Sequence, residues 1–150
     1  MNKLTAMISG MICLMSCDSA VVFMGFRHVV DKSWSAADEY TFFFDITDTS
    51  RSYNIAALLR NTDLYPADSI TILYRMQHVN NVFADTIAIC LKDESGKWKG
   101  RGISLFQTET FVLTNYFFAD TGAYTVSISQ LTSFGNLTGV DEVGLRVRSF

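Results

Sequence analysis

An alternating stretch, Tyr40-Thr41-Phe42-Phe43-Phe44-Asp45-Ile46-Thr47, decides the fold class of this chain. Successive side chains of a β-strand point to opposite faces, so Tyr40, Phe42, Phe44 and Ile46 share one face. The residues between them, Phe43 apart, are polar. This alternation predicts a strand that rests one face on a hydrophobic core.

The same period of two recurs along the rest of the chain. Clear rows run through residues 53–59, 70–76, 83–91, 124–128 and 140–147, and weaker candidates cover 104–112 and 115–118. Turn residues separate the rows, notably at 48–52, at the Tyr65-Pro66 loop and at 93–96. About eight strands at this spacing predict an all-β fold, an antiparallel β-sandwich or a jelly-roll-like barrel.

The rows also predict which residues fill the core. We expect these side chains to be largely buried: Phe42, Phe44, Ile55, Ile72, Ile89, Tyr124, Val126 and Leu145. The apolar run Val21-Val22-Phe23 is expected to pair as an edge strand. A short turn of helix is the expectation for residues 130–134.

Length and charge narrow the class of protein. The chain has 150 residues, with 12 basic and 15 acidic side chains and a formal net charge of −3. A chain of this size predicts one domain. No basic stripe is present, which argues against a nucleic-acid partner.

The N-terminus carries the pattern of a lipoprotein signal. Residues 4–16 contain no charge and follow Lys3, and the segment ends in Leu14-Met15-Ser16-Cys17, which resembles a bacterial lipobox. We therefore expect residues 1–16 to be a signal peptide, with lipid (palmitate) on Cys17. The mature domain would span 17–150, with 17–32 as tether and edge strand. An ordinary secretory signal with an incidental cysteine, or a weakly inserted anchor, are the alternatives.

The three cysteines are expected to have different fates. Cys13 would leave with the signal peptide and Cys17 would be acylated, so Cys90 would remain without a disulfide partner. Its apolar neighbours predict a buried structural thiol. A nucleophilic role would instead require His28 or His78 close by.

The stretch Asp120-Thr121-Gly122-Ala123-Tyr124 resembles the tyrosine corner of immunoglobulin-like sandwiches. In that motif the tyrosine hydroxyl bonds to the backbone a few residues upstream. Tyr124 is therefore predicted to have a structural role.

Acidic residues cluster near two predicted loops. Asp45 and Asp48 lie beside one turn, and Asp63 and Asp68 flank the Tyr65-Pro66 loop. Loop carboxylates can bind calcium, and paired carboxylates can hydrolyse glycosides. Aspartate also bonds its own backbone in turns, which is the simpler interpretation. We expect no metal site.

Aromatic residues offer a second candidate site. Exposed Trp34, Trp98, Tyr65 and Tyr116 would form a platform for stacking sugars, whereas buried rings would only fill the core. No phosphate-binding glycine loop, zinc-type spacing or serine elbow is present. The sequence thus predicts no catalytic residues, no enzyme and no cofactor.

Several short blocks occur in an order that resembles the GldH gliding-motility lipoprotein family of Bacteroidetes. They are Trp34 with Asp38, the stretch 40–48, Tyr53-Asn54-Ile55, 59–62 before Tyr65-Pro66, 96–100, Gly122-Ala123-Tyr124, Gln130 and 141–147. Asp68 and Leu131-Thr132 depart from that pattern, which has Asn and a Met-Arg-like pair there. The resemblance runs from the lipobox to the C-terminus.

The resemblance implies an envelope lipoprotein associated with gliding machinery, and it supplies no catalytic residues. We expect a non-enzymatic scaffold or assembly component held to the bilayer through Cys17, with other envelope proteins, gliding components among them, as partners. Tyr65 and Trp98 are the candidate interaction surface. A glycan-binding envelope module is the alternative. Only Asp18 follows Cys17, without the acidic run that often marks surface export in this phylum, so the expected location is the outer membrane facing the periplasm.

Overall fold

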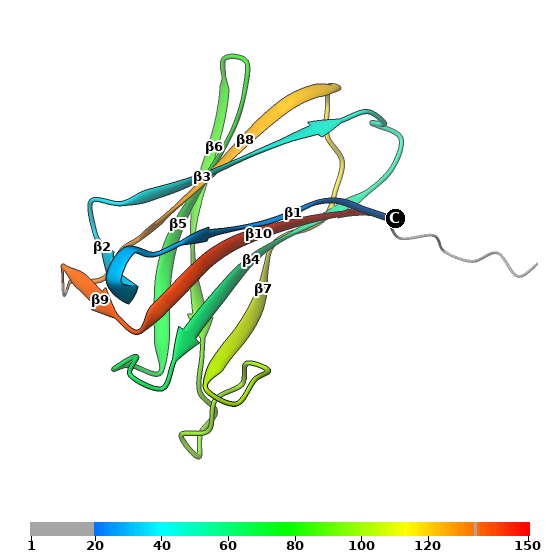
Figure 1. Cartoon of the computed structure of the whole chain (residues 1–150). Helices are drawn as coiled ribbons and strands as arrows, with labels where there is room; N and C mark the ends of the chain where they lie inside the picture. The colour runs from blue at the N-terminus through cyan, green and yellow to red at the C-terminus, as the bar shows by residue number, and fades with distance from the viewer. Residues whose placement is uncertain (1–19, 134) are drawn as a thin grey trace, which may run out of the picture.

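The computed structural model describes residues 20–133 and 135–150, so the predicted signal peptide and Cys17 lie outside the described residues. The described chain is all-β and antiparallel, as the alternation predicts (Figure 1). Its strands are β1 (Ala20–His28), β2 (Ser33–Ser35), β3 (Glu39–Ile46), β4 (Tyr53–Thr62), β5 (Ser69–His78), β6 (Asn81–Cys90), β7 (Leu105–Tyr116), β8 (Gly122–Gln130), β9 (Asn136–Thr138) and β10 (Val140–Ser149). A single turn of 3-10 helix, η1 (Val30–Lys32), follows β1.

The strands form two four-stranded sheets and a small two-stranded one. The first sheet has the order β1-β10-β4-β7, and the second has the order β3-β8-β5-β6. Strands β2 and β9 pair separately, with buried Trp34 opposite buried Leu137. Every pairing is antiparallel. Strand β1 lies at the edge of the first sheet and pairs only with β10 among the described strands.

One hydrophobic core receives side chains from both large sheets. All eight residues predicted to be buried are at most 5% exposed, which confirms the predicted inward face. Strands β3, β5 and β8 contribute Phe42, Ile72 and Val126, and β4 and β10 contribute Ile55 and Leu145. Each large aromatic or branched side chain removed from water contributes about 1.5–3 kcal/mol. Two sheets sharing one core is an arrangement consistent with a sandwich.

Strand β4 is buried on both of its faces. Ala56 and Leu58 point away from the core yet are 1% exposed. Arg60 lies on the same outer face by the alternation of the strand, and its guanidinium is 3.9 Å from the Phe26 ring centroid. Arg60 also pairs with Glu142 at 2.5 Å. The sequence row at 53–59 therefore marks a central strand.

The pairing register places the two ends of the first sheet far apart. Ala20 pairs with Ser149, which pairs with Tyr53 at one end of this sheet. At the other end His28 pairs with Glu142, which pairs with Arg60. Figure 1 shows the C-terminus beside the start of β1. The nine residues of β1 span roughly 30 Å at strand rise.

Some local predictions differ from the structure. Residues 131–133 form no helix: Gln130 ends β8, and its side-chain oxygen accepts the Thr132 N–H at 2.7 Å, which holds a turn; Phe134 is outside the described residues. The two weak candidates at 104–112 and 115–118 are one strand, β7, with an irregular register opposite Tyr53 and Ile55.

No helix in residues 20–133 and 135–150 is long and apolar enough to cross a membrane.

The two adjacent phenylalanines of β3 give a matched test of the core. Phe44 is 5% exposed and Phe43 is 66% exposed. Phe44→Ala should lower the free energy of unfolding by about 3–5 kcal/mol, because it removes buried apolar area and leaves a cavity. Phe43→Ala should change it by less than about 1 kcal/mol, as expected at an exposed site. Urea unfolding measures both, and equal losses in the two variants would contradict the assigned inward face.

Candidate functional site

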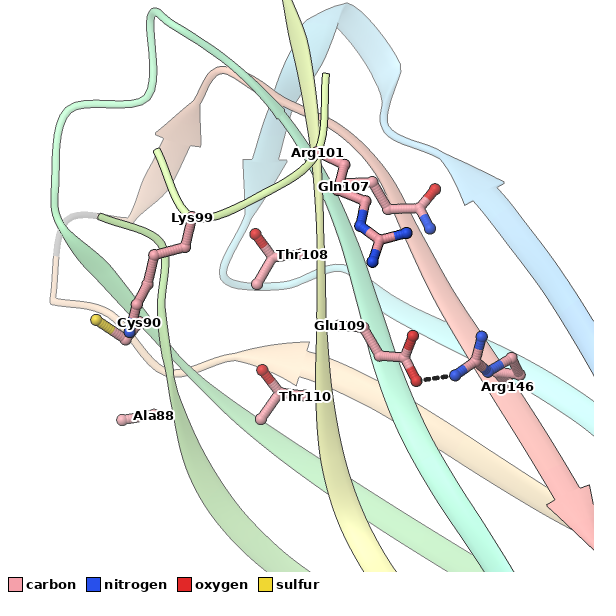
Figure 2. Close-up of a pocket in the computed structure, with 9 residues that line it drawn as sticks. All are labelled: Ala88, Cys90, Lys99, Arg101, Gln107, Thr108, Glu109, Thr110 and Arg146. Atoms are coloured by element: carbon pink, nitrogen blue, oxygen red, sulfur yellow. Dashed lines mark hydrogen bonds and ion pairs between the residues drawn. The ribbon is translucent and has the colours of Figure 1, made fainter. Parts of the chain in front are cut away.

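A cleft of about 870 Å³, lined mainly by polar side chains, lies beside β7 (Figure 2). Its walls come from three places: Ala88 and Cys90 at the end of β6, Lys99 and Arg101 in the loop before β7, and residues 107–110 of β7 with Arg146 of β10. Strands β6 and β7 are edge strands of different sheets. The cleft therefore opens where these two unpaired edges come together.

The loop that borders the cleft is held to β7 by backbone hydrogen bonds. Arg101 donates its N–H to the Gln107 carbonyl at 3.0 Å and accepts the Gln107 N–H at 2.9 Å. A Cβ on Gly100 would lie 2.9 Å from the Thr108 hydroxyl oxygen and 3.0 Å from the Gln107 carbonyl oxygen. Glycine is thus required for this approach.

Basic groups outnumber acidic groups in the cleft. Glu109 pairs with Arg146, which leaves Lys99 and Arg101 as the cations of the lining without a recorded ion pair among the described residues. The Thr108 hydroxyl oxygen is buried and has no hydrogen-bond partner in the described part of the chain. Figure 2 shows Thr108 and Thr110 on the side of β7 that faces Ala88 and Cys90. Such a lining suits an anionic, hydrogen-bonding ligand.

Sequence reasoning did not identify this cleft. A usable signal was present, because Lys97, Lys99 and Arg101 lie within five residues just before a predicted strand. What the sequence could not supply was the partner strand, since β6 approaches from the other sheet.

Trp98 and Tyr65 do not form an exposed surface together. Trp98 is half-buried: its ring stacks on Phe106 with centroids 5.3 Å apart, and the Lys92 ammonium lies 4.5 Å from its centroid. Tyr65 is only 2% exposed, and its hydroxyl donates to the Ser69 carbonyl at 3.0 Å. The expectation of an exposed contact ring at Tyr65 is therefore wrong, because this side chain closes a loop over the core.

The four aromatics proposed as a sugar platform do not form an exposed platform either. Trp34 is fully buried and donates its ring N–H to the Asp38 carbonyl at 3.2 Å. With Tyr65 buried as well, two of the four rings cannot stack on a sugar. Tyr116 packs at the opposite end of the first sheet, with its ring centroid 5.0 Å from that of Phe118. Burial of rings in the core explains this set.

Cys90 is exposed, which contradicts the predicted buried thiol. Ile89 takes the inward position of β6, so the alternation turns the next side chain outward. The Cys90 thiol donates to the Lys92 carbonyl at 3.0 Å and lines the cleft. The apolar neighbours of Cys90 in the sequence suggested burial, but β6 is an edge strand and this side chain is exposed.

Tyr124 forms the predicted tyrosine corner, with its hydroxyl donating to the Asp120 carbonyl at 2.8 Å. Two further tyrosines close loops in a similar way, which the sequence did not reveal. Tyr53 donates to the Asp48 carbonyl at 2.6 Å, and Tyr65 to that of Ser69. Burial raises the pKa of all three hydroxyls above the usual value, that of Tyr65 to about 12.

The loop aspartates serve turns and an ion pair. Asp48 accepts both the Ser50 N–H at 2.9 Å and the Ser50 hydroxyl at 2.6 Å, and these bonds lower the pKa of its carboxyl. Asp68 lies 3.3 Å from the Lys92 ammonium. Within the described residues no three His, Cys, Asp or Glu side chains group as metal ligands.

Comparison with known proteins identifies the family. The profile of the GldH lipoprotein family matches residues 21–147. The chain belongs to the GldH lipoprotein family. This is a lipoprotein family and not an enzyme family, and membership implies a membrane-anchored location in the cell envelope. The match covers all strands of the two large sheets except the first residue of β1 and the last two of β10.

No curated protein matches the chain. Among solved structures, the VP2 subviral particle of infectious bursal disease virus is similar with a TM-score of 0.43 and 15% identity. That alignment covers 89% of this chain and 33% of the viral chain, so this chain spans about a third of the viral protein's length.

Tyr124→Phe tests the tyrosine corner. The variant keeps the ring and loses one hydrogen bond, so the free energy of unfolding should fall by about 0.5–1.5 kcal/mol. Tyr116→Phe is the matched control, because the Tyr116 hydroxyl makes no recorded hydrogen bond in the described chain. Urea unfolding that shows no difference between the two variants would mean that the Asp120 contact contributes nothing.

Tyr65 predicts how stability depends on alkaline pH. Its folded pKa, about 12, exceeds the ordinary value of 10 because burial disfavours the phenolate. A raised folded pKa gives a contribution to stability that is complete below pH 10 and is lost as the pH rises through about 12. Tyr65→Phe should therefore reduce the loss of stability over this range, measured by urea unfolding at a series of pH values. An identical slope in wild type and variant would contradict the assignment.

Proposed function

We propose that this chain is a lipid-anchored, non-enzymatic scaffold or assembly component of the cell envelope that works with gliding machinery. The family match over residues 21–147 carries the proposal. A β-sandwich with a shared core is a rigid support for contact surfaces. Burial of Trp34 and Tyr65 argues against the glycan-binding alternative.

The anchor would be lipid on Cys17 after removal of residues 1–16. Strand β1 begins at Ala20, three residues after Cys17, and three extended residues span at most about 10 Å. The lipid would thus hold the Ala20 end of the first sheet close to the bilayer. Exposed Val21 and Phe150 lie at this end and would face the lipid surface.

The opposite end of the sheet would face away from the membrane. Gln107 of β7 pairs with Arg60, which pairs with Glu142, at the end remote from Ala20. The polar cleft, which Gln107 lines, would therefore be open to soluble or membrane-bound partners. The single Asp18 after Cys17 favours retention on the periplasmic face of the outer membrane.

Replacement of Cys17 tests the anchor. Cys17→Ala should abolish incorporation of labelled palmitate and leave the signal peptide uncut by the lipoprotein signal peptidase, with a larger mass as a result. Cys90→Ala is the matched control and should label and mature normally, because Cys90 lies within the folded domain. Normal labelling of Cys17→Ala would contradict the proposal.

The scaffold role is tested in the same cells. The tagged wild-type protein, cross-linked in its own membranes, should co-purify with a defined set of envelope proteins, and Cys17→Ala should lose this set. Recovery of the wild-type protein as an isolated monomer would argue against a scaffold.

A further inference from the structure

The two large sheets are closed along one side and open along the other. On the closed side, β1 and β3 pack together: the Phe23 ring centroid lies 6.2 Å from those of both Phe42 and Phe44. On the open side lie β6 and β7, with the 870 Å³ cleft at one end and a hollow of about 140 Å³, lined by His78 and Phe83, at the other. Between these hollows the Tyr74 hydroxyl of β5 donates to the Val112 carbonyl of β7 at 3.2 Å. The cleft and the smaller hollow are therefore separate, and the free edge of β6 extends from one to the other.

Strand β6 has the free edge. It has ten residues, Asn-Val-Phe-Ala-Asp-Thr-Ile-Ala-Ile-Cys, with no Lys, Arg, Pro or Gly and one charge, Asp85. Counting from the two-residue turn after His78, its outward backbone groups belong to Val82, Ala84, Thr86, Ala88 and Cys90. The Thr86 N–H is consistent with this count, since it bonds the Asp85 carboxylate at 2.7 Å. Edge strands of this length normally carry charges or proline that prevent pairing.

The edge of β7 is less available. Arg101 already occupies both backbone groups of Gln107, and the strand is irregular opposite Tyr53 and Ile55. A strand added at this open side would therefore pair with β6 and cover the threonine side of β7 at the cleft.

The charges at the cleft select the partner. Lys99 and Arg101 line the end near Cys90, and Glu109 is already paired with Arg146. A second copy of this chain fits poorly. Antiparallel pairing of β6 with itself would bring this cationic end against Asn81-Val82-Phe83, which bears no carboxylate. An extended acidic segment can form backbone hydrogen bonds with the free edge of β6 and ion pairs with Lys99 and Arg101.

We propose that an extended acidic segment of another envelope protein adds to β6 as an antiparallel strand, with its carboxylates at Lys99 and Arg101. Backbone hydrogen bonds to β6 would supply affinity, and the cations would supply selectivity and register. The inference rests on the proposed scaffold function and names the surface through which it acts.

Peptide binding to the full-length lipidated protein in detergent tests the site. The probe is a peptide of about ten residues, the length of β6, that alternates valine or threonine with glutamate. Fluorescence anisotropy should show saturable binding, and the peptide should slow maleimide labelling of Cys90. A peptide with lysine in place of glutamate, and one with methylated backbone nitrogens, should both fail. Equal binding of the lysine peptide, or no binding of the acidic one, would overturn the proposal.

Charge reversal in the cleft has a matched control on the same loop. Lys99→Glu combined with Arg101→Glu should weaken binding of the acidic peptide at least about tenfold, because attraction becomes repulsion. The control is Lys97→Glu, at an exposed position outside the cleft lining, which should have less than about a twofold effect. Equal effects of the cleft and control variants would mean that overall charge, and not the cleft, determines binding, which would overturn the proposal.

Ala84→Pro tests the edge itself. It removes an N–H that points away from β5, so the β5–β6 ladder should persist and thermal unfolding should change little, while peptide binding is lost. If the variant unfolds, the methylated peptide tests the same hydrogen bonds. Self-association of the wild type through β6, detected by sedimentation and abolished by Ala84→Pro, would assign the edge to a second copy and overturn the acidic partner.

The outcome separates this site from the scaffold function. If the cleft variants still acylate and co-purify with the same envelope proteins as wild type, the scaffold proposal stands and the β6 site is wrong. If wild type has no partners in membranes, the scaffold proposal fails irrespective of the peptide result.

Discussion

The structure depends on one physical constraint, the exclusion of water between the inner faces of two sheets. Phe42, Phe44 and Val126 on one sheet meet Ile55 and Leu145 on the other, and none is more than 5% exposed. Burial of these side chains holds the sheets face to face and thereby fixes which strands become edges. Tyr53, Tyr65 and Tyr124 add to this packing. Their rings belong to the core while their hydroxyls donate to loop carbonyls, which holds the loops against the core.

Period-two alternation made the strands and their inward faces predictable. At Phe42 and Phe44 the pattern, the propensity and the burial agree, and the tyrosine corner at Tyr124 was readable from its glycine and its spacing. Cys90 and Tyr65 show where such reasoning stops. Both have apolar or aromatic surroundings in the sequence, yet Cys90 is exposed because its strand is an edge, and Tyr65 is buried because its loop folds over the core.

The cleft was unpredictable for the same reason. Its lining comes from β6, β7, β10 and the loop before β7, and only the tertiary arrangement of the two sheets brings these together. The turn between β5 and β6 gave little local signal, since Val79 adopts a φ of 51° that a β-branched residue rarely takes. The sequence row at 83–91 therefore missed the start of β6 at Asn81, and with it part of the free edge.

The proposed function has a defined geometry, because the proposed lipid anchor and the cleft lie at opposite ends of the first sheet. With lipid on Cys17, as proposed, the Ala20 end would stay near the bilayer, whereas Gln107 and the cleft lie at the far end of the same sheet. A partner segment that reaches the cleft would then lie away from the membrane by roughly the length of β1, about 30 Å. Addition to the ten-residue β6 would hold a flexible acidic segment along its length. Many backbone hydrogen bonds and few charges would then decide binding, which suits a scaffold that must release its partner when the segment is pulled or competed away.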